Sequence, residues 1–218
     1  MIAREDAPEP MYHNGSMRVL DLGCGRGRNI VITKVASGDE IIGMDIAFDR
    51  LQAAAKRHAY RRFIQADALK LPFGDEAFRC IVCQVGMPYM NIPVALAEIN
   101  RVLETGGTVH FRLHAFRFTM HELKNAFPRP KAMAFRLWVL TNGLILHFTG
   151  KPVAIGGRYE SFQTRRGMSM ALRQAGFEEI EFSRLPDNFT NQLIVSARKP
   201  VHMGEGIPIS AQVKPALL

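Results

Sequence analysis

One short run near the start of the chain restricts the fold more than any other. The segment VLDLGCGRG, residues 19–27, places three glycines at alternate positions directly after an apolar run. Residues 29–37 follow this glycine loop and read best as a helix, despite their β-branched side chains. A strand that passes through a glycine-rich turn into a helix typically opens an α/β sheet and brings backbone close to a ligand.

Strand-like and helix-like segments alternate along most of the chain. The strands are predicted at 17–23, 39–46, 61–67, 77–86, 108–116, 179–185 and 191–199. Helices are predicted at 29–37, 48–59, 93–107 and 164–177, with Gly106 and Gly176 closing the last two. This order predicts a doubly wound, Rossmann-like α/β sheet of seven strands, mostly parallel, with a C-terminal antiparallel hairpin. Residues 117–163 break the alternation and are expected to form a helical cap after the fifth strand.

Length and composition fit one domain. The chain has 218 residues, of which 47% are hydrophobic, enough for one sizeable core. We expect an N-terminal arm at 1–16, the domain at 17–198, and a Pro- and Gly-containing tail at 199–218 that is poorly ordered and dispensable. No window holds about 18 uninterrupted apolar residues, and the N-terminus lacks the apolar region of a secretory signal. These features predict a cytoplasmic protein without a membrane span.

The net charge is +8, with a pI of about 9.8. Such a charge attracts nucleic acid, acidic lipid surfaces or acidic metabolites. The basic residues are scattered, and the tightest cluster is Lys56, Arg57, Arg61 and Arg62. A solvated basic surface is therefore the favoured interpretation.

The glycine spacing argues against two phosphate-binding motifs. The dinucleotide pattern G-x-G-x-x-G would require a third glycine at position 28, which is Arg28. No Gly-Lys-Ser/Thr follows, so the loop is not a Walker A motif either.

The run DLGCGRG at 21–27 instead resembles the first motif of class I S-adenosylmethionine-dependent methyltransferases. Acidic residues that resemble further landmarks of this family end the second strand, at Asp45, and the third, at Asp67. The segments FGDEAFRCIVCQ, INRVLETGGTVHFR and LRQAGFEEIEF resemble its fourth strand, its following helix and strand, and its last helix and strand. The resemblance covers about 17–116 and 164–197.

The resemblance implies S-adenosylmethionine as cofactor and assigns it eleven contacts: Asp21, Gly23, Cys24, Gly25, Arg26, Gly27, Asp45, Ile46, Asp67, Ala68 and Gln84. It implies that the glycines admit the methionine part, that Asp45 holds the ribose hydroxyls, and that Ile46 packs on the adenine. Plainer interpretations stay open: the glycines form only a turn, Asp45 is a helix N-cap, and Asp67 is a turn residue. Cys80 and Cys83 have metal-site spacing but are expected to pack in the core, so no metal is predicted.

The methyl acceptor is expected under the cap. His114, after the fifth strand, is the leading candidate base and Tyr89 a second, although a surface or helix-capping histidine is an equal alternative. The cap combines aromatic and aliphatic residues with five cations that could bind an acid: Arg117, Arg129, Lys131, Arg136 and Arg158. These features favour O- or N-methylation of a small, acidic, partly apolar metabolite. A packed helical hairpin or a dimer interface is the alternative, so the chain is expected to be a monomer or a homodimer.

Three other functions stay open. Gly86-Met87-Pro88-Tyr89 lies where base-amino methyltransferases carry Asn/Asp-Pro-Pro-Tyr, and the basic charge would suit nucleic acid. The same cofactor also serves cyclisation or aminocarboxypropyl transfer. A binding protein that has kept the fold without turnover is the last alternative.

Overall fold

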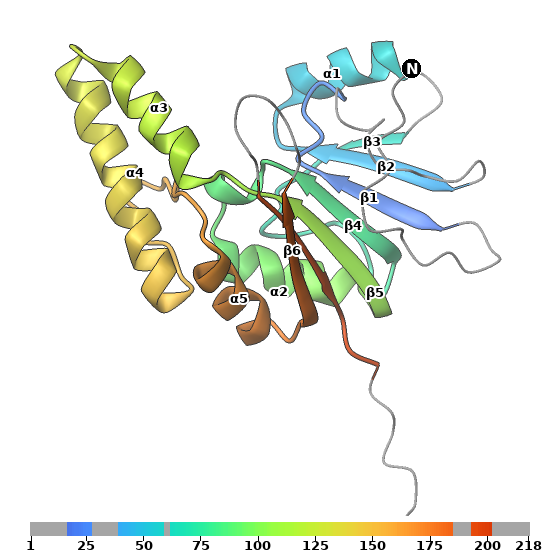
Figure 1. The fold of residues 1–218 in the computed structure, drawn as a ribbon. Coiled ribbons are helices and arrows are strands. Elements are labelled where there is room, and N and C mark those ends of the chain that lie inside the picture. Colours follow the sequence, from blue (N-terminus) through green and yellow to red (C-terminus); the bar gives the residue numbers. More distant parts are fainter. Residues whose placement is uncertain (1–16, 28–38, 59–61, 185–192, 202–218) are drawn as a thin grey trace, which may run out of the picture.

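The computed structural model describes residues 17–27, 39–58, 62–184 and 193–201. Its centre is a seven-stranded sheet with the order β3-β2-β1-β4-β5-β7-β6 (Figure 1). The strands are β1 (Arg18–Leu22), β2 (Glu40–Asp45), β3 (Arg62–Gln65), β4 (Phe78–Gln84), β5 (Leu103–Arg112), β6 (Glu178–Arg184) and β7 (Leu193–Arg198). β7 is antiparallel to both β5 and β6, and the other six strands all run in one direction, which confirms the predicted mostly parallel sheet with a C-terminal hairpin.

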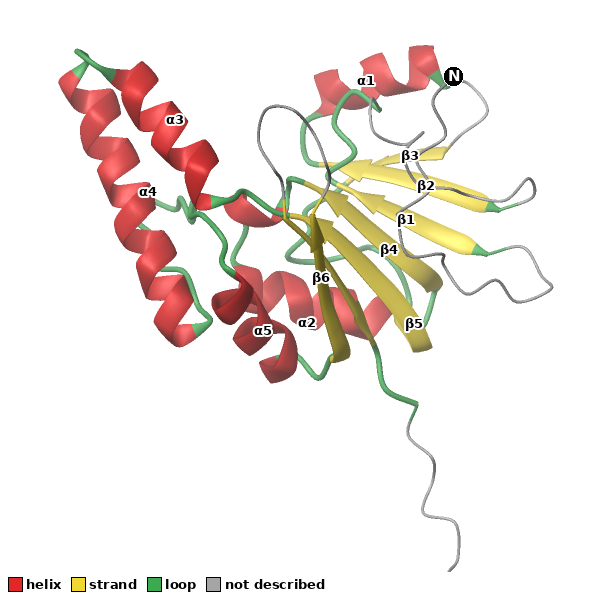
Figure 2. Ribbon diagram, in the orientation of Figure 1, coloured by secondary structure: helices red, strands yellow, loops and turns green. Residues whose placement is uncertain are grey.

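Helices flank the sheet on both sides. They are α1 (Phe48–Arg57), α2 (Ile92–Val102), α3 (Phe116–Ala126), α4 (Pro130–Thr149) and α5 (Arg165–Gln174), with a short 3-10 helix η1 (Met87–Tyr89). Figure 2 shows α1 on one side of the sheet and α2 and α5 on the other. The predicted helix at 29–37 and the arm at 1–16 lie outside the described residues.

The insertion after β5 is a helical hairpin of α3 and α4 that projects from the sheet (Figure 1). Its inner side is tightly packed, because a Cβ at Gly143 of α4 would overlap the ring of Phe162. Gly143 and Leu146 are buried on this side, which faces the segment that leads into α5. The helical insertion after the fifth strand is therefore confirmed.

The two cysteines of β4 face different cores. Cys83 belongs to the large cluster that includes side chains of α2 and α5, whereas Cys80 packs with Val19 and Ile41. Burial raises the pKa of Cys83 to about 12 and that of Cys80 to about 11. Both are therefore core thiols, as expected from their positions on opposite faces of one strand.

The helix predicted at 93–107 is too long. α2 ends at Val102, and the next residue, Leu103, already pairs with Phe78 of β4. Gly106 therefore lies inside β5, at φ 75°, near a register shift between the two strands. Val102 and Leu103 are apolar on both sides of the boundary, so the apolar pattern does not mark it, and the polar and glycine residues that follow at 104–107 read as a helix end although they belong to β5.

Lys199 caps the C-terminal end of α2. Its Nζ donates hydrogen bonds to the carbonyl oxygens of Asn100 at 3.0 Å and Leu103 at 2.8 Å, and pairs with Glu76 at 3.3 Å. The backbone of Lys199 also pairs with Gly106 and Gly107. The first residue of the predicted tail is thus anchored to the domain.

We therefore expect Lys199→Met to lower the free energy of unfolding by about 1–3 kcal/mol, because the methionine fills the same space but leaves two carbonyls without their donor. Urea unfolding followed by circular dichroism measures this. The matched control is Lys151→Met, at an exposed position, which should change stability by less than about 0.5 kcal/mol. Equal effects of the two substitutions would contradict the capping role.

Candidate active site

A cavity of about 1030 Å³ opens at the carboxyl ends of β1, β2, β3 and β4. The strand order reverses between β1 and β4, and open α/β sheets bind their ligands at such a point. Nine of the eleven predicted cofactor residues line the cavity: Gly23, Cys24, Gly25, Arg26, Asp45, Ile46, Asp67, Ala68 and Gln84. Tyr89 lines it as well, whereas Asp21, Gly27 and His114 are not among its lining residues.

The glycine loop is held in a conformation that suits glycine. Gly23, Gly25 and Gly27 have φ values of 71°, 56° and 70°, in the left-handed region. The backbone N–H groups of Gly23 and Cys24 both donate to the carbonyl oxygen of Met44, at 2.7 and 2.9 Å. The loop is therefore fastened to β2 while its outer side faces the cavity.

Asp45 joins this loop to the end of β2. One carboxylate oxygen accepts the N–H of Gly25 at 2.9 Å and the other accepts the N–H of Ala47 at 2.9 Å. Ala47, not Asp45, is the N-cap residue of α1, and it makes no side-chain cap hydrogen bond. Each oxygen of Asp45 has a second lone pair, so the carboxylate can still accept two hydroxyl donors from the cavity.

The neighbouring positions offer an apolar face and a turn. Ile46 is 66% exposed although it is aliphatic, so a flat apolar ligand could cover it. Asp67 is exposed, and its side chain accepts the N–H of Leu69 at 2.9 Å. The interpretation of Asp67 as a turn residue is therefore compatible with the geometry, but its position also lines the cavity.

Three buried side chains lie in or next to the glycine loop: Asp21, Cys24 and His58. Asp21 is 2% exposed in β1. The pKa of the Cys24 thiol is raised to about 12, mainly by burial and further by the charges of Asp21 and Asp45, so Cys24 stays protonated and is no nucleophile. The ring of His58 lies 2.8 Å from the carbonyl oxygen of Gly27 and holds the far end of the loop from the end of α1.

The end of β4 is strained where it meets the cavity. Val85 has a φ of 66°, a conformation that β-branched residues rarely adopt, and its N–H donates to the carbonyl oxygen of Arg112. A Cβ at Gly86 would lie 2.7 Å from the sulfur of Cys83 and 3.1 Å from the methyl group of Met90. There is thus no room for the Asn or Asp side chain that a base-amino methyltransferase places at this position.

The two predicted catalytic residues are neighbours. The rings of Tyr89 and His114 meet edge to face with centroids 5.7 Å apart, and Phe118 of α3 lies 4.5 Å from His114 on another side. His114 is buried, and burial together with the charge of Arg136 lowers its pKa to about 4. Burial raises the pKa of Tyr89. At neutral pH the pair is thus a neutral imidazole behind a protonated phenol, and the phenol faces the cavity.

Arg136, the most buried of the five cap cations, already pairs with two carboxylates of the cap. Arg136 of α4 pairs with Glu122 at 2.6 Å and with Glu160 at 2.6 Å. Arg158 lies over the ring of Phe135, 5.7 Å from its centroid. Arg136, one of the cations expected to bind an acidic acceptor, is thus neutralised within the cap.

Sequence reasoning missed part of the cavity wall. Tyr159 and Gly157 reach it from the segment after α4, and the hydroxyl of Tyr159 accepts a hydrogen bond from Asn91 at 3.2 Å. Arg50 of α1 lines it too. No motif in the sequence links Tyr159 to Asn91, which lies 68 positions away.

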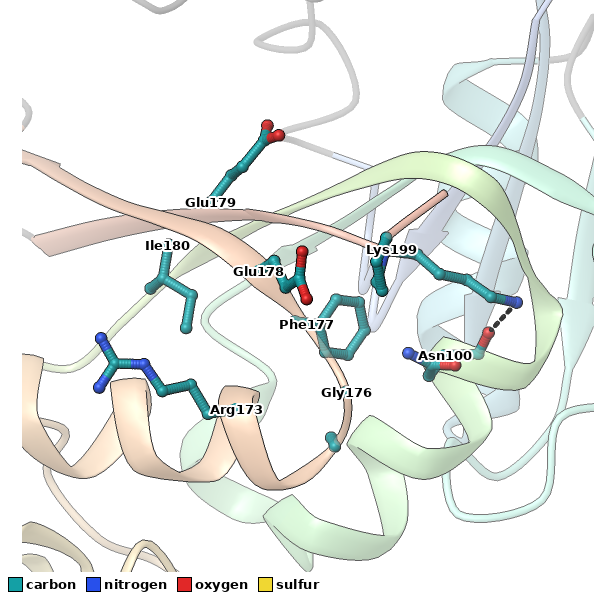
Figure 3. Close-up of a pocket in the computed structure, with 10 residues that line it drawn as sticks. Asn100, Arg173, Gly176, Phe177, Glu178, Glu179, Ile180 and Lys199 are labelled. Carbon is teal, nitrogen blue, oxygen red and sulfur yellow. Dashed lines mark hydrogen bonds between the residues drawn. The ribbon is translucent and has the colours of Figure 1, made fainter. Parts of the chain in front are cut away.

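A second cavity of about 660 Å³ lies at the opposite, amino-terminal edge of the sheet (Figure 3). Its wall includes Asn100, Gly176, Phe177 and Lys199. The amine of Lys199 donates a hydrogen bond to the carbonyl oxygen of Asn100. This amine caps α2 through the carbonyl oxygens of Asn100 and Leu103 and pairs with Glu76. The cavity at the carboxyl ends of the strands is therefore the candidate active site.

The carboxyl-end cavity suits S-adenosylmethionine. Its volume falls in the range of cofactor pockets, and it combines a buried carboxylate, exposed apolar surface at Ile46 and a loop without side chains at Gly25. A ribose, an adenine and an amino acid would each find a suitable surface there.

Comparisons with known proteins agree with this geometry. A family model described as "Methyltransferase domain" matches residues 19–107. A demethylmenaquinone methyltransferase of Thermus thermophilus is 32% identical over 183 residues, which cover 81% of this chain and 77% of that protein. A 2-phytyl-1,4-naphtoquinone methyltransferase of Thermosynechococcus vestitus is 26% identical over 74% of this chain and 72% of that protein. Among solved structures, an S-adenosylmethionine-dependent methyltransferase of Methanosarcina mazei superposes with a TM-score of 0.57 at 18% identity, over 87% of this chain and 95% of that one.

The fold is a doubly wound sheet with a cavity at its switch point, the place where proteins of this architecture bind nucleoside-containing ligands. The chain belongs to the class I S-adenosylmethionine-dependent methyltransferases. It is an enzyme of this class, and S-adenosylmethionine is its cofactor.

Proposed function

We propose that this enzyme methylates a ring carbon of a naphthoquinol-type acceptor, a reduced two-ring quinone. The observation that carries the proposal is the aromatic wall of the cavity where the cap meets the cofactor site. Tyr89 and Tyr159 line this part, and the ring of His114, which also contacts Phe118, meets Tyr89 edge to face. Flat side chains of this kind stack well on a flat aromatic acceptor.

Similarity to relatives supports the same acceptor. The Thermus thermophilus relative, named for demethylmenaquinone, matches 81% of the chain, well beyond the shared domain at 19–107. The expected acidic acceptor has weaker support, because Arg136 is paired with two carboxylates. A nucleic-acid base has weaker support as well, because Gly86 offers no polar side chain and no space for one.

The chemistry determines the redox state of the acceptor. S-adenosylmethionine supplies an electrophilic methyl group, so the acceptor must be the electron-rich quinol and not the quinone. The quinol would lose its hydroxyl proton, and a ring carbon would bond to the methyl group as the methyl–sulfur bond breaks and S-adenosylhomocysteine leaves. The proton on that carbon would then be lost to solvent and the oxygen would regain one, so that the methylated quinol and one net proton are the other products. The chain's main task is to align ring and methyl group at short distance.

Within this proposal the residues divide into two groups. Gly23, Gly25, Asp45, Ile46, Asp67 and Ala68 hold the cofactor, with Asp21, Cys24 and Gly27 shaping the loop and Arg26 and Gln84 beside the reacting end. Tyr89 contacts the acceptor. His114 is a positioning residue that acts through Tyr89, because its ring lies behind the phenol and its low pKa makes it a weak base.

The test is methyl transfer from isotope-labelled S-adenosylmethionine to a short-chain demethylated naphthoquinol, kept reduced, with product analysis by mass spectrometry and NMR. We expect methylation at a ring carbon of the quinol. We expect no methyl transfer to the oxidised quinone, to a malonyl thioester or to RNA. Cofactor binding is measured separately by calorimetry. Transfer to the thioester or RNA but not to the quinol would overturn the acceptor class and leave the methyltransferase assignment intact.

A further inference from the structure

α4 carries an apolar face that is open to solvent. Leu137, Leu144 and Phe148 are 52%, 53% and 63% exposed. Together with Thr141 they recur at alternating steps of four and three residues, which places them on one face of the helix. None of these four positions holds a charge. The opposite face, with Val139, Asn142, Gly143 and Leu146, is buried against the rest of the cap and α5.

The same part of the chain holds nearly all of the net positive charge. Residues 116–166, from the start of α3 to the first turn of α5, contain nine Lys and Arg but only two Asp and Glu, a net charge of +7 against +8 for the whole chain. Both acidic residues, Glu122 and Glu160, pair with the single cation Arg136. The eight remaining cations of this segment are exposed, and the segment holds no other carboxylate.

Some of these cations lie beside the apolar face. The guanidinium of Arg166 is 5.9 Å from the ring centroid of Phe148. Lys151 follows Gly150, the C-cap residue of α4, and is exposed three positions after Phe148. Apolar side chains and basic groups thus border one another on one surface.

We propose that this surface docks onto a bilayer that contains anionic lipids. Leu137, Leu144 and Phe148 would enter the boundary between headgroups and acyl chains, while Arg166 and Lys151 would pair with lipid phosphates. No helix in the described ranges is long and apolar enough to cross a bilayer, so the contact is made at its surface. The inference concerns the outer face of the cap and goes beyond the proposed function, on which it does not depend.

A second copy of the chain is the main rival occupant. Two segments of net charge +7 repel each other when they face, whereas an anionic surface attracts both. Three exposed apolar side chains also fall well short of the roughly 800 Å² per partner that a stable dimer buries. Charge and area therefore favour lipid over self-association.

The full-length protein carries its own reporter for a test. Trp138 is the single tryptophan of the chain and lies on α4 next to Leu137. We expect a blue shift of its emission, and co-flotation of the protein, with vesicles of equal parts phosphatidylcholine and phosphatidylglycerol. Binding to pure phosphatidylcholine should be at least about tenfold weaker, and added salt should weaken binding to the anionic vesicles.

The decisive variant keeps every charge. Leu144→Ser with Phe148→Ser should weaken binding to the anionic vesicles by about tenfold or more, because the apolar contribution is lost. Val94→Ser on α2, at a position 40% exposed, is the matched control and should bind like wild type. Calorimetric binding of S-adenosylhomocysteine checks that each variant is folded.

Three results would overturn the proposal. The first is wild-type protein that does not bind anionic vesicles, and the second is a double variant that binds them as tightly as wild type. The third is light scattering that shows a dimer which the double variant converts to a monomer, since a second copy would then cover the face. No methyl donor or acceptor enters these measurements, so their failure is distinct from failure of the proposed function.

Discussion

Asp45→Ala is expected to weaken the binding of S-adenosylmethionine and S-adenosylhomocysteine by about 100-fold. The carboxylate is 6% exposed at the edge of the cavity and keeps free lone pairs toward it. Two hydrogen bonds to a charged acceptor contribute about 3 kcal/mol together, which corresponds to about 100-fold in Kd. Calorimetric titration of both ligands measures the change.

Two further variants separate binding from folding. Asp45→Asn keeps the shape and one acceptor oxygen but loses the charge, so its affinity should lie between those of wild type and Asp45→Ala. Asp49→Ala removes an exposed carboxylate from the first turn of α1 nearby and should leave affinity unchanged. Asp45→Ala also leaves the N–H groups of Gly25 and Ala47 without their acceptor, and thermal unfolding measures the resulting loss of folding stability separately from the loss of affinity. Affinity of Asp45→Ala within threefold of wild type would refute the ribose assignment.

The main features of this site follow from sequence because they are local. Apart from Asp21, which is buried within β1, each predicted cofactor residue lies in the glycine loop or close to the end of a strand, and parallel strands bring these ends to one edge of the sheet. The amino-acid sequence alone is thus enough to place Asp45 next to the glycine loop. A different local rule, the alternation of side chains along a strand, predicts that Cys80 and Cys83 point to opposite faces of β4 and pack in the core.

The missing parts depend on contacts between distant segments. The pairing of Arg136 with Glu122 and Glu160 links α4 to α3 and to the segment after α4, and no sequence spacing reveals it. Tyr159 reaches the cavity for the same reason. The predicted boundary between α2 and β5 is wrong because Leu103 is apolar in either structure, and pairing with Phe78 decides which one forms.

Local strain is also invisible in the sequence. Nothing in the run CQVGMPY marks Val85 as a residue with positive φ, since valine strongly prefers extended backbone. Such conformations persist where the surrounding structure enforces them, often at functional sites. Here Val85 lines the cavity between Gln84 and Gly86.

His114 makes the stability of the enzyme depend on pH. Burial and the charge of Arg136 lower its pKa from 6.5 to about 4 in the folded protein. Between these values the unfolded chain binds a proton that the folded chain does not, so stability falls as the pH drops from 6.5 toward 4. The contribution of this one group amounts to about 2–3 kcal/mol over that range.

Between pH 7 and about pH 4, the free energy of unfolding of wild type should therefore fall by about 2–3 kcal/mol more than that of His114→Phe. The phenylalanine keeps a ring between Tyr89 and Phe118, and the backbone hydrogen bonds of residue 114 with Gln163 do not need the imidazole. Urea unfolding at a series of pH values gives the difference, in which carboxylates common to both proteins cancel. His121→Gln, on the exposed side of α3, is the control and should follow the wild-type profile. Parallel pH profiles of wild type and His114→Phe would show that the imidazole is not held neutral, and would remove the reason to treat His114 as a positioning residue behind Tyr89.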